Sequence, residues 1–299
     1  MKRPLKFRVA TLVIAISCIG YACSENSTES INVEAPGNSA GVLALPDYSS
    51  IHNPLNPCND FGVLHNAGLD YILDYYSVSS FEELTYEQVR YATARFTVEN
   101  AELLEISDLS VLEDLVDDVV ENVTIEDAFQ SLPLSSEQIE FCNQIRDGVL
   151  TAEFSSLDQF IQMLESIEQD ILNSSIPEHQ KEFPLMVMAI AKHSAVYHAE
   201  SIGIPESSAK HGGDTILEMD EKKKEKRFAQ VVEADLVGAI TGASLGFIGG
   251  LVSGFIGGAL LGGGIGGIPG AAATAITGSA VGAVTGAVGG SGAYILKPS

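Results

Sequence analysis

The side chains best suited to acid–base, nucleophilic or metal chemistry are few and scattered in this sequence. His193 and His198 lie five residues apart in a segment with helical periodicity. That spacing does not stack them on one helix face, as metal ligands at i and i+4 would be. His65 and Asn66 are adjacent. They either form a catalytic pair or, as we favour, leave Asn66 to cap the helix that follows.

Three motifs of common active sites are absent from the sequence. It contains no HExxH, P-loop or CxxC pattern, and these patterns carry zinc, phosphate and redox chemistry respectively. One short segment collects Asp114, Asp117, Asp118 and Glu121, and we favour a solvated acidic face over a divalent-cation site. We therefore expect no enzyme, no catalytic residue, no metal and no cofactor.

Two cysteines, Cys58 and Cys142, lie beyond the N-terminal segment. In an oxidising compartment such a pair can form one disulfide. The sequence leaves this open, because the distance between the two residues in the fold is not fixed by their spacing.

The N-terminal segment has the layout of a secretory signal. An apolar run, too short for a standard spanning helix, follows Lys2, Arg3, Lys6 and Arg8. The end of the segment, Ile19-Gly-Tyr-Ala-Cys23, resembles a bacterial lipobox, and the Ser-Glu-Asn after it is similar to the tether of Bacteroidota surface lipoproteins. The resemblance implies removal of residues 1–22, lipidation of Cys23 and a location at the outer membrane or surface of a Gram-negative cell envelope. An unlipidated cut near Ala22, or a cut at Cys18, remains the alternative.

Composition divides the rest of the chain into three parts. Residues 23–45 are rich in Ser, Asn, Gly and Glu and predict a flexible tether. Residues 46–235 predict an acidic all-α domain of five to seven helices, with capping boxes beginning at Ser80, Ser110 and Ser156. The helices expected from apolar periodicity cover residues 82–100, 111–121, 136–150, 157–171 and 178–202.

The third part, residues 236–299, carries 20 of the 29 glycines and no charged residue before Lys297. Each interior glycine weakens a helix in water by about 1 kcal/mol, but in a bilayer small residues let helices approach closely. We predict a hairpin of helices 236–261 and 271–296, each long enough to cross a bilayer of about 30 Å. Its helix-packing positions recur every four residues: Gly238, Gly242, Gly246, Gly250, Gly254, Gly258, Gly262, Gly278, Gly282, Gly286 and Gly290.

This repeat resembles the glycine-zipper hairpins of bacterial membrane proteins and of bacteriocin-like toxins. The resemblance implies insertion into membrane lipid. A row of period four winds around a helix of about 3.6 residues per turn, so we also expect the tail to associate with copies of itself. Two alternatives are a low-complexity linker and a water-soluble hairpin folded against the domain.

Charge is distributed very unevenly. The formal net charge is −24, and all 40 acidic residues fall between Ser24 and Asp235. This balance argues against nucleic acid as a partner, because a backbone reader needs a basic face. One basic run precedes the tail and suits anionic headgroups at a membrane surface; it comprises Lys222, Lys223, Lys224, Lys226 and Arg227.

Residues 56–73, with Asn-Pro-Cys-Asn at their start and His-Asn before Gly-Leu-Asp-Tyr, resemble the opening of uncharacterised Bacteroidota lipoproteins. This likeness implies no activity. We expect a non-enzymatic envelope lipoprotein whose tail inserts or self-associates in a membrane. The alternatives are a secreted or surface pore-forming antibacterial protein, and an acidic binding module with the tail packed in its core. The protein partner is not indicated.

Overall fold

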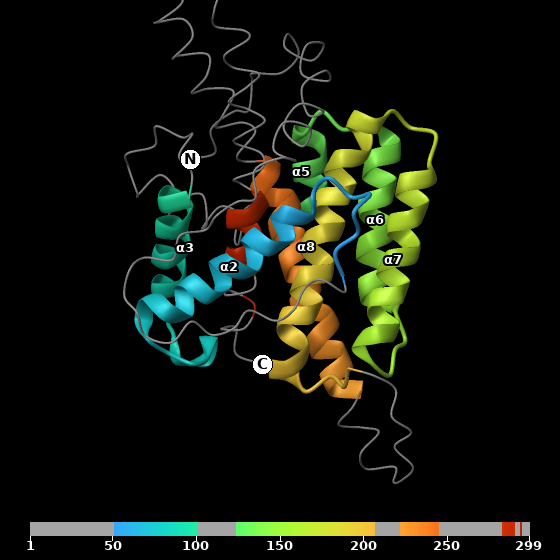
Figure 1. Cartoon of the computed structure of the whole chain (residues 1–299). Coiled ribbons are helices and arrows are strands. Elements are labelled where there is room, and N and C mark those ends of the chain that lie inside the picture. Colours follow the sequence, from blue (N-terminus) through green and yellow to red (C-terminus); the bar gives the residue numbers. More distant parts are fainter. Residues whose placement is uncertain (1–50, 101–123, 207–221, 245–282, 291–293, 295–299) are drawn as a thin grey trace, which may run out of the picture.

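The computed structural model describes residues 51–100, 124–206, 222–244, 283–290 and 294 (Figure 1). Within these ranges the chain forms helices and no strand, which confirms the all-α prediction. Several predictions concern residues outside these ranges and stay predictions. They are the signal, lipidation at Cys23, the tether, the capping box at Ser110, the helix 111–121 and the glycine positions 246–282.

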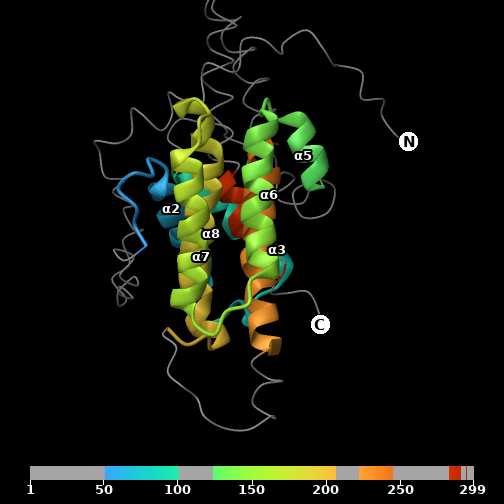
Figure 2. The same ribbon diagram turned by 90° about the vertical axis from the view of Figure 1, so that its right-hand side faces the viewer.

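The helix order is α2 (Asn59–Tyr76), η3 (Phe81–Glu83), α3 (Tyr86–Asn100), α5 (Ile125–Ser131), α6 (Ser136–Thr151), α7 (Leu157–Asn173) and α8 (Glu178–Ile202). Two further helical segments, called helix 222–244 and helix 283–290, follow. In Figure 1, α8 stands between α2 and α3 on one side and α6 and α7 on the other. Figure 2 shows the long axes of α6, α7 and α8 running nearly together.

Side-chain caps account for several helix starts. Ser135 and Gln138 form a reciprocal capping box at α6, and Ser156 accepts a hydrogen bond from the Gln159 amide at α7. The predicted helices 136–150 and 178–202 are confirmed as α6 and α8. The prediction of one helix from residue 82 was wrong in its start, because Thr85 and Gln88 exchange hydrogen bonds that begin α3 separately.

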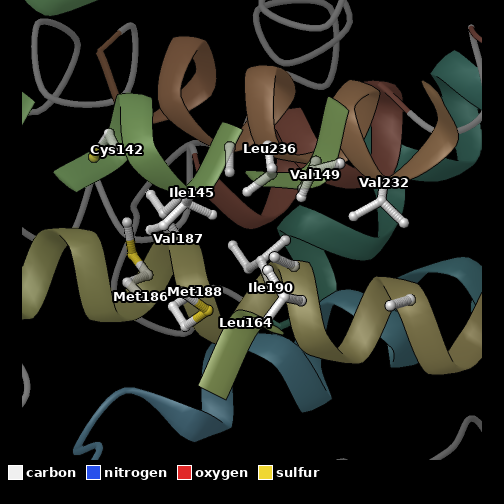
Figure 3. Packing of buried hydrophobic residues seen from close by; sticks show 14 of the residues in the cluster. Cys142, Ile145, Val149, Leu164, Met186, Val187, Met188, Ile190, Val232 and Leu236 are labelled. Carbon is white, nitrogen blue, oxygen red and sulfur yellow. The ribbon is translucent and has the colours of Figure 1, made fainter. Parts of the chain in front are cut away.

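The central helix is α8, in which every residue from 181 to 195 is buried. A helix that is buried all round must be enclosed by others, and α8 packs against α2, α6 and α7. Figure 3 shows Ile145 and Val149 facing Ile190, with Leu236 of helix 222–244 beside them. This principal core therefore joins α6, α7, α8 and helix 222–244.

The predicted boundary between Asp235 and Leu236 falls inside helix 222–244. Leu236, Ala239 and Ile240, beyond the boundary, belong to the same principal core as Phe228 before it. The described tail residues are thus part of the helical domain. Within the described ranges, no helix combines the length and apolar character needed to cross a bilayer.

Helix 283–290 is enclosed on more than one side. Ala283 and Ala287 belong to the principal core, while Val284 and Val288 belong to a second core. The other buried members of this second core come from residues 69–96, in α2, α3 and the connection between them. Positions four apart share a helix face, so two different faces of this short helix fill two different cores.

Glycines on two helices allow their backbones to touch. A Cβ atom built on Gly238 would lie 2.1 Å from the Gly286 carbonyl oxygen, and one on Gly290 would lie 2.5 Å from the Ala234 oxygen. No side chain larger than hydrogen fits such an approach. The glycine row thus works as a packing surface inside this domain at the positions that the structure describes.

The same contacts fix the direction of the two helices. Gly286 contacts Gly238, and Gly290, four residues later, contacts Ala234, four residues earlier. One further step in each direction reaches Tyr294, whose hydroxyl donates to Gln230 Oε1 at 2.8 Å. The helices are therefore antiparallel, as the hairpin prediction requires of the two ends of the tail.

We expect Gly238→Ala and Gly286→Ala each to lower the free energy of unfolding by about 2 kcal/mol, because the added methyl meets a carbonyl oxygen. An unopposed Gly→Ala change in a helix stabilises by about 1 kcal/mol instead. Urea unfolding of the non-lipidated full chain measures the difference. Gln144→Ala, at an exposed position of α6 where the side chain contacts Glu140 of the same helix, is the control. A gain in stability from either glycine change would contradict the contact.

Candidate functional site

A buried carboxylate marks the point where three helices meet. Ser194 donates a hydrogen bond of 2.6 Å to Asp235 Oδ2. The Nε2 atoms of His65 and His198 lie 3.3 and 3.6 Å from the same oxygen. α2 supplies His65, α8 supplies Ser194 and His198, and helix 222–244 supplies Asp235. These four residues, all buried, are called the Asp235 cluster.

Helix periodicity explains why α8 contributes these two residues. Ser194 and His198 are four apart and share one face, which is turned toward helix 222–244. His193 is five residues from His198 and lies against Gly62 of α2 instead. The expectation that His193 and His198 do not stack together is therefore confirmed.

Asn66 determines which protons His65 carries. The Asn66 amide nitrogen donates to the His193 carbonyl at 3.1 Å, so its oxygen is the atom 2.9 Å from His65 Nδ1. Nδ1 must then donate, and Nε2 faces a carboxylate. His65 and Asp235 are therefore buried neighbours, and they form an ion pair when the His65 ring carries both protons.

The surroundings keep Asp235 ionised. Burial alone would raise the pKa of this carboxyl, but the charge of His65 and the hydrogen bonds from His198 and His65 outweigh burial and hold the pKa below its ordinary value. A charge in such a position needs its partners, because removing one partner of a buried pair costs about 3–5 kcal/mol.

The arrangement does not match that of a nucleophilic triad. In a triad the histidine lies between the serine and the carboxylate and accepts the serine proton. Here Asp235 lies in the middle, and the Ser194 proton points to the carboxylate. Among the described residues, no group of three or more His, Cys, Asp or Glu side chains is placed to hold a metal ion. The Asp235 cluster can hold three helices together around one buried carboxylate.

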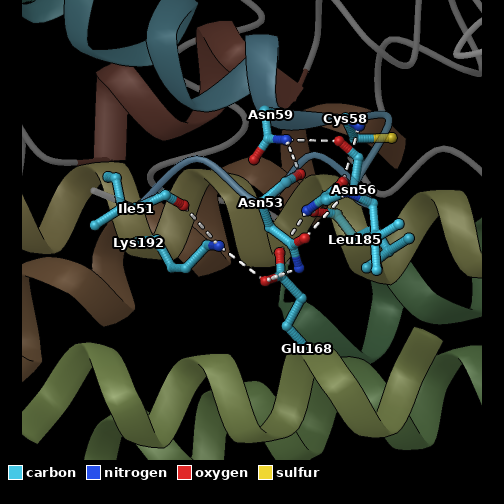
Figure 4. Close-up of polar contacts among 9 residues, drawn as sticks. Ile51, Asn53, Asn56, Cys58, Asn59, Glu168, Leu185 and Lys192 are labelled. Atoms are coloured by element: carbon cyan, nitrogen blue, oxygen red, sulfur yellow. Dashed lines mark hydrogen bonds and ion pairs between the residues drawn. The ribbon is translucent and has the colours of Figure 1, made fainter. Parts of the chain in front are cut away.

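A second buried ion pair lies further along α8 (Figure 4). Lys192 Nζ lies 2.9 Å from Glu168 Oε2 of α7 and donates to the Ile51 carbonyl at 2.9 Å. Asn53 and Asn56 donate to the two Glu168 oxygens at 2.7 and 2.8 Å. This Glu168 cluster fixes the residues that precede α2 onto α7 and α8.

The Asn-Pro motif of residues 56–59 has a structural role in this arrangement. Asn56 Oδ1 accepts a hydrogen bond from the Cys58 amide, and its amide group also reaches the Leu185 carbonyl. The turn predicted here leads directly into α2 at Asn59. Asn66, however, lies in the middle of α2 and not at its start, so the prediction that it caps a helix was wrong.

The disulfide that the sequence left open is not formed. Cys58 and Cys142 are both buried, and neither takes part in a disulfide. The Cys58 thiol contacts the Glu182 carbonyl at 3.4 Å. Burial raises the pKa of the Cys142 thiol, which lies in the principal core. Each side chain is thus occupied within the fold.

The basic run at the start of helix 222–244 lies on the surface. Lys222, Lys223, Lys224 and Lys226 are exposed, and Arg227 pairs with Glu82 at 3.0 Å across an exposed contact. The role of this run at a membrane surface stays a prediction. Of the predicted packing glycines, Gly238, Gly242, Gly286 and Gly290 fall within the described ranges and face one another inside the chain.

Sequence reasoning missed Asp235 and the partners that surround it. Two signals were present: Asp235 is the last acidic residue before the uncharged stretch, and it stands between Ala234 and Leu236. A charge embedded in an apolar row predicts a buried, paired side chain. The partner on α2 could not be found this way, because His65 is distant in sequence and only the fold brings it near.

Comparisons with family models, curated proteins and solved structures find no match. The function proposed for this chain consequently derives from its own residues.

We expect Asp235→Asn to lower the free energy of unfolding by about 3–5 kcal/mol, because His65, Ser194 and His198 lose the buried carboxylate that they surround. Glu233→Gln is the matched control on the same helix. Its ion pair with Arg146 is partly exposed, and such pairs contribute about 0–1 kcal/mol. Denaturant unfolding of each variant measures both losses. Equal losses at the two positions would contradict the ion pair, and adding His65→Gln should restore part of the stability lost in Asp235→Asn.

Proposed function

We propose that this chain is a lipid-anchored, non-enzymatic protein of the bacterial envelope whose helical domain stores a membrane-active segment. The segment is the uncharged, glycine-rich stretch 236–296. In the stored form its two ends are packed in the domain. On release the segment enters a membrane, where its uncharged glycine faces pack against one another or against further copies.

One observation carries this proposal: residues 236–244 and 283–290 fill the core of an otherwise acidic domain. Gly238 and Gly286 touch through their backbones, and glycine faces of this kind also suit helix contacts in lipid. The same glycine faces can therefore pack inside the domain in water and against other helices in lipid. This supports a segment that is stored in the domain and can also enter a membrane.

The surface charge of the domain is consistent with this proposal. The basic run that begins at Lys222 is exposed and opens the same helix that carries Leu236 into the core. Clusters of Lys and Arg near a membrane segment are attracted to anionic headgroups. This run would bring the start of the segment to the lipid surface before release.

A second candidate function is favoured by the deep burial of residues 236–244 and 283–290. If the ends of the tail never leave the core, the protein is an acidic binding module that the tail completes. Truncation after Asp235 does not separate the two candidates, because it removes Leu236, Ala239 and other core residues and so disrupts the domain itself. A reversible cross-link that holds the tail in the domain of the intact chain, here called the lock, is required.

Thr97 of α3 and Thr285 of helix 283–290 supply the position for such a lock. Their hydroxyl oxygens lie 2.6 Å apart in the interior, so Thr97→Cys with Thr285→Cys places two thiols in position for a disulfide. We expect the reduced double variant to bind vesicles of phosphatidylethanolamine and phosphatidylglycerol without releasing an entrapped dye. The oxidised form should not bind, because its tail cannot leave the core.

The lock experiment uses the full chain with Cys23→Ala, so that a lipid anchor does not mask binding by the tail. The single variant Thr97→Cys is the control for oxidation without a cross-link. Binding that is equal in oxidised and reduced forms would contradict release of the tail. No binding in either form would favour the acidic binding module, whereas leakage on release would favour an antibacterial pore.

A further inference from the structure

His193 lies at a close contact between α2 and α8. A Cβ atom built on Gly62 of α2 would come within 2.3 Å of His193 Cδ2 and 2.6 Å of the Ala189 carbonyl oxygen. The His193 ring therefore rests directly against the α2 backbone, and it is almost fully buried. Moving α2 away from α8 would therefore bring water to this ring.

The charged groups around His193 do not favour a second positive charge. His65 on α2, Lys192 beside it on α8 and His52 in the residues before α2 all act against protonation. The two carboxylates of the region are already engaged. Asp235 is bound by its cluster on helix 222–244, and Glu168 on α7 is bound by Lys192 and two asparagines.

Burial, reinforced by these positive neighbours, lowers the pKa of His193 from 6.5 to about 3 in the folded chain. Below the ordinary pKa the unfolded chain therefore binds a proton that the folded chain does not. The folded state is favoured fully at neutral pH and loses stability as the pH falls from about 6.5 toward 3. Asp235 stays ionised over this interval, because its own pKa is held low.

The consequence of moving α2 extends to the tail. α2 carries His65, whose Nε2 atom lies 3.3 Å from Asp235 Oδ2. It also carries Gly68, where an added Cβ would lie 2.7 Å from Val288 of helix 283–290. α2 thus contacts both the residue that precedes the glycine-rich segment and the described helix 283–290 within it.

We propose that mild acid, by protonating His193, separates α2 from α8 and so frees the glycine-rich segment. The separation of helices stands on the contact at Gly62, and its use to deliver the segment rests on the proposed function.

Urea unfolding of the non-lipidated full chain, followed by circular dichroism, tests the switch. Between about pH 7 and pH 5 the unfolding equilibrium constant should rise about 25-fold from His193 alone. His193→Gln should remove most of this rise. His179→Gln, at the start of α8 and away from this contact, should keep it. The same pH dependence in His193→Gln as in the unaltered chain would overturn the proposal.

A direct titration covers the case in which His193→Gln does not fold. In the folded, unaltered chain the His193 ring signals in NMR should show no protonation down to about pH 5. Titration near the ordinary value for histidine would overturn the proposal.

Vesicle binding separates this inference from the proposed function. With phosphatidylethanolamine and phosphatidylglycerol vesicles, acid should increase binding of the reduced Thr97→Cys, Thr285→Cys chain and leave the oxidised chain unbound. If His193→Gln removes the pH dependence of unfolding but acid does not change binding, the acid-driven separation stands and the proposed function fails. If binding depends on the lock but neither binding nor unfolding depends on His193, the proposed function stands and the acid switch is overturned.

Discussion

The described fold depends on one buried charge, the carboxylate of Asp235. It stands on the helix that continues into the uncharged part of the chain, and its partners come from α2 and α8. A lone carboxylate at this depth would be very unfavourable, so His65 and Ser194 must be in place whenever helix 222–244 is packed. Helix 222–244 can therefore pack in this position only when α2 and α8 are assembled around Asp235.

Glycine packing supplies the complementary attraction. A helix rich in glycine is weak by itself in water, but backbone contact between Gly238 and Gly286 lets two such helices pack without intervening side chains. The apolar faces of helix 283–290 then fill both cores. These helices have low intrinsic helix propensity, so their stability comes from the burial of their apolar side chains. Movement of the surrounding helices would therefore destabilise the tail.

Local signals in the sequence predicted the all-α class, and for α6 and α8 they also predicted the bounds. Apolar periodicity and Ser caps act within a few residues, so they can be read from the chain directly. The start of α3 was missed because Thr85 and Gln88 form a competing cap after η3. The antiparallel pairing of the glycine helices followed from their spacing, while their place inside the domain did not.

The candidate site illustrates what sequence patterns leave undetermined. His65 and Asp235 are far apart in the chain, and neither belongs to a motif with a known spacing. The spacing of His193 and His198 placed them on different faces of one predicted helix, but only the fold shows that one contacts Gly62 and the other Asp235. Their different surroundings, and hence their different chemistry, depend on tertiary contacts that no local pattern encodes.

Hydrogen exchange of the non-lipidated full chain at neutral pH tests the central claim most directly. If both ends of the glycine-rich segment are held in the core, amides in residues 236–244 and 283–290 should exchange as slowly as those of α8. Their protection should then be lost together with that of α2 as denaturant is added. Fast exchange of these residues while α8 stays protected would show that the tail is not part of the folded domain, and would contradict the account.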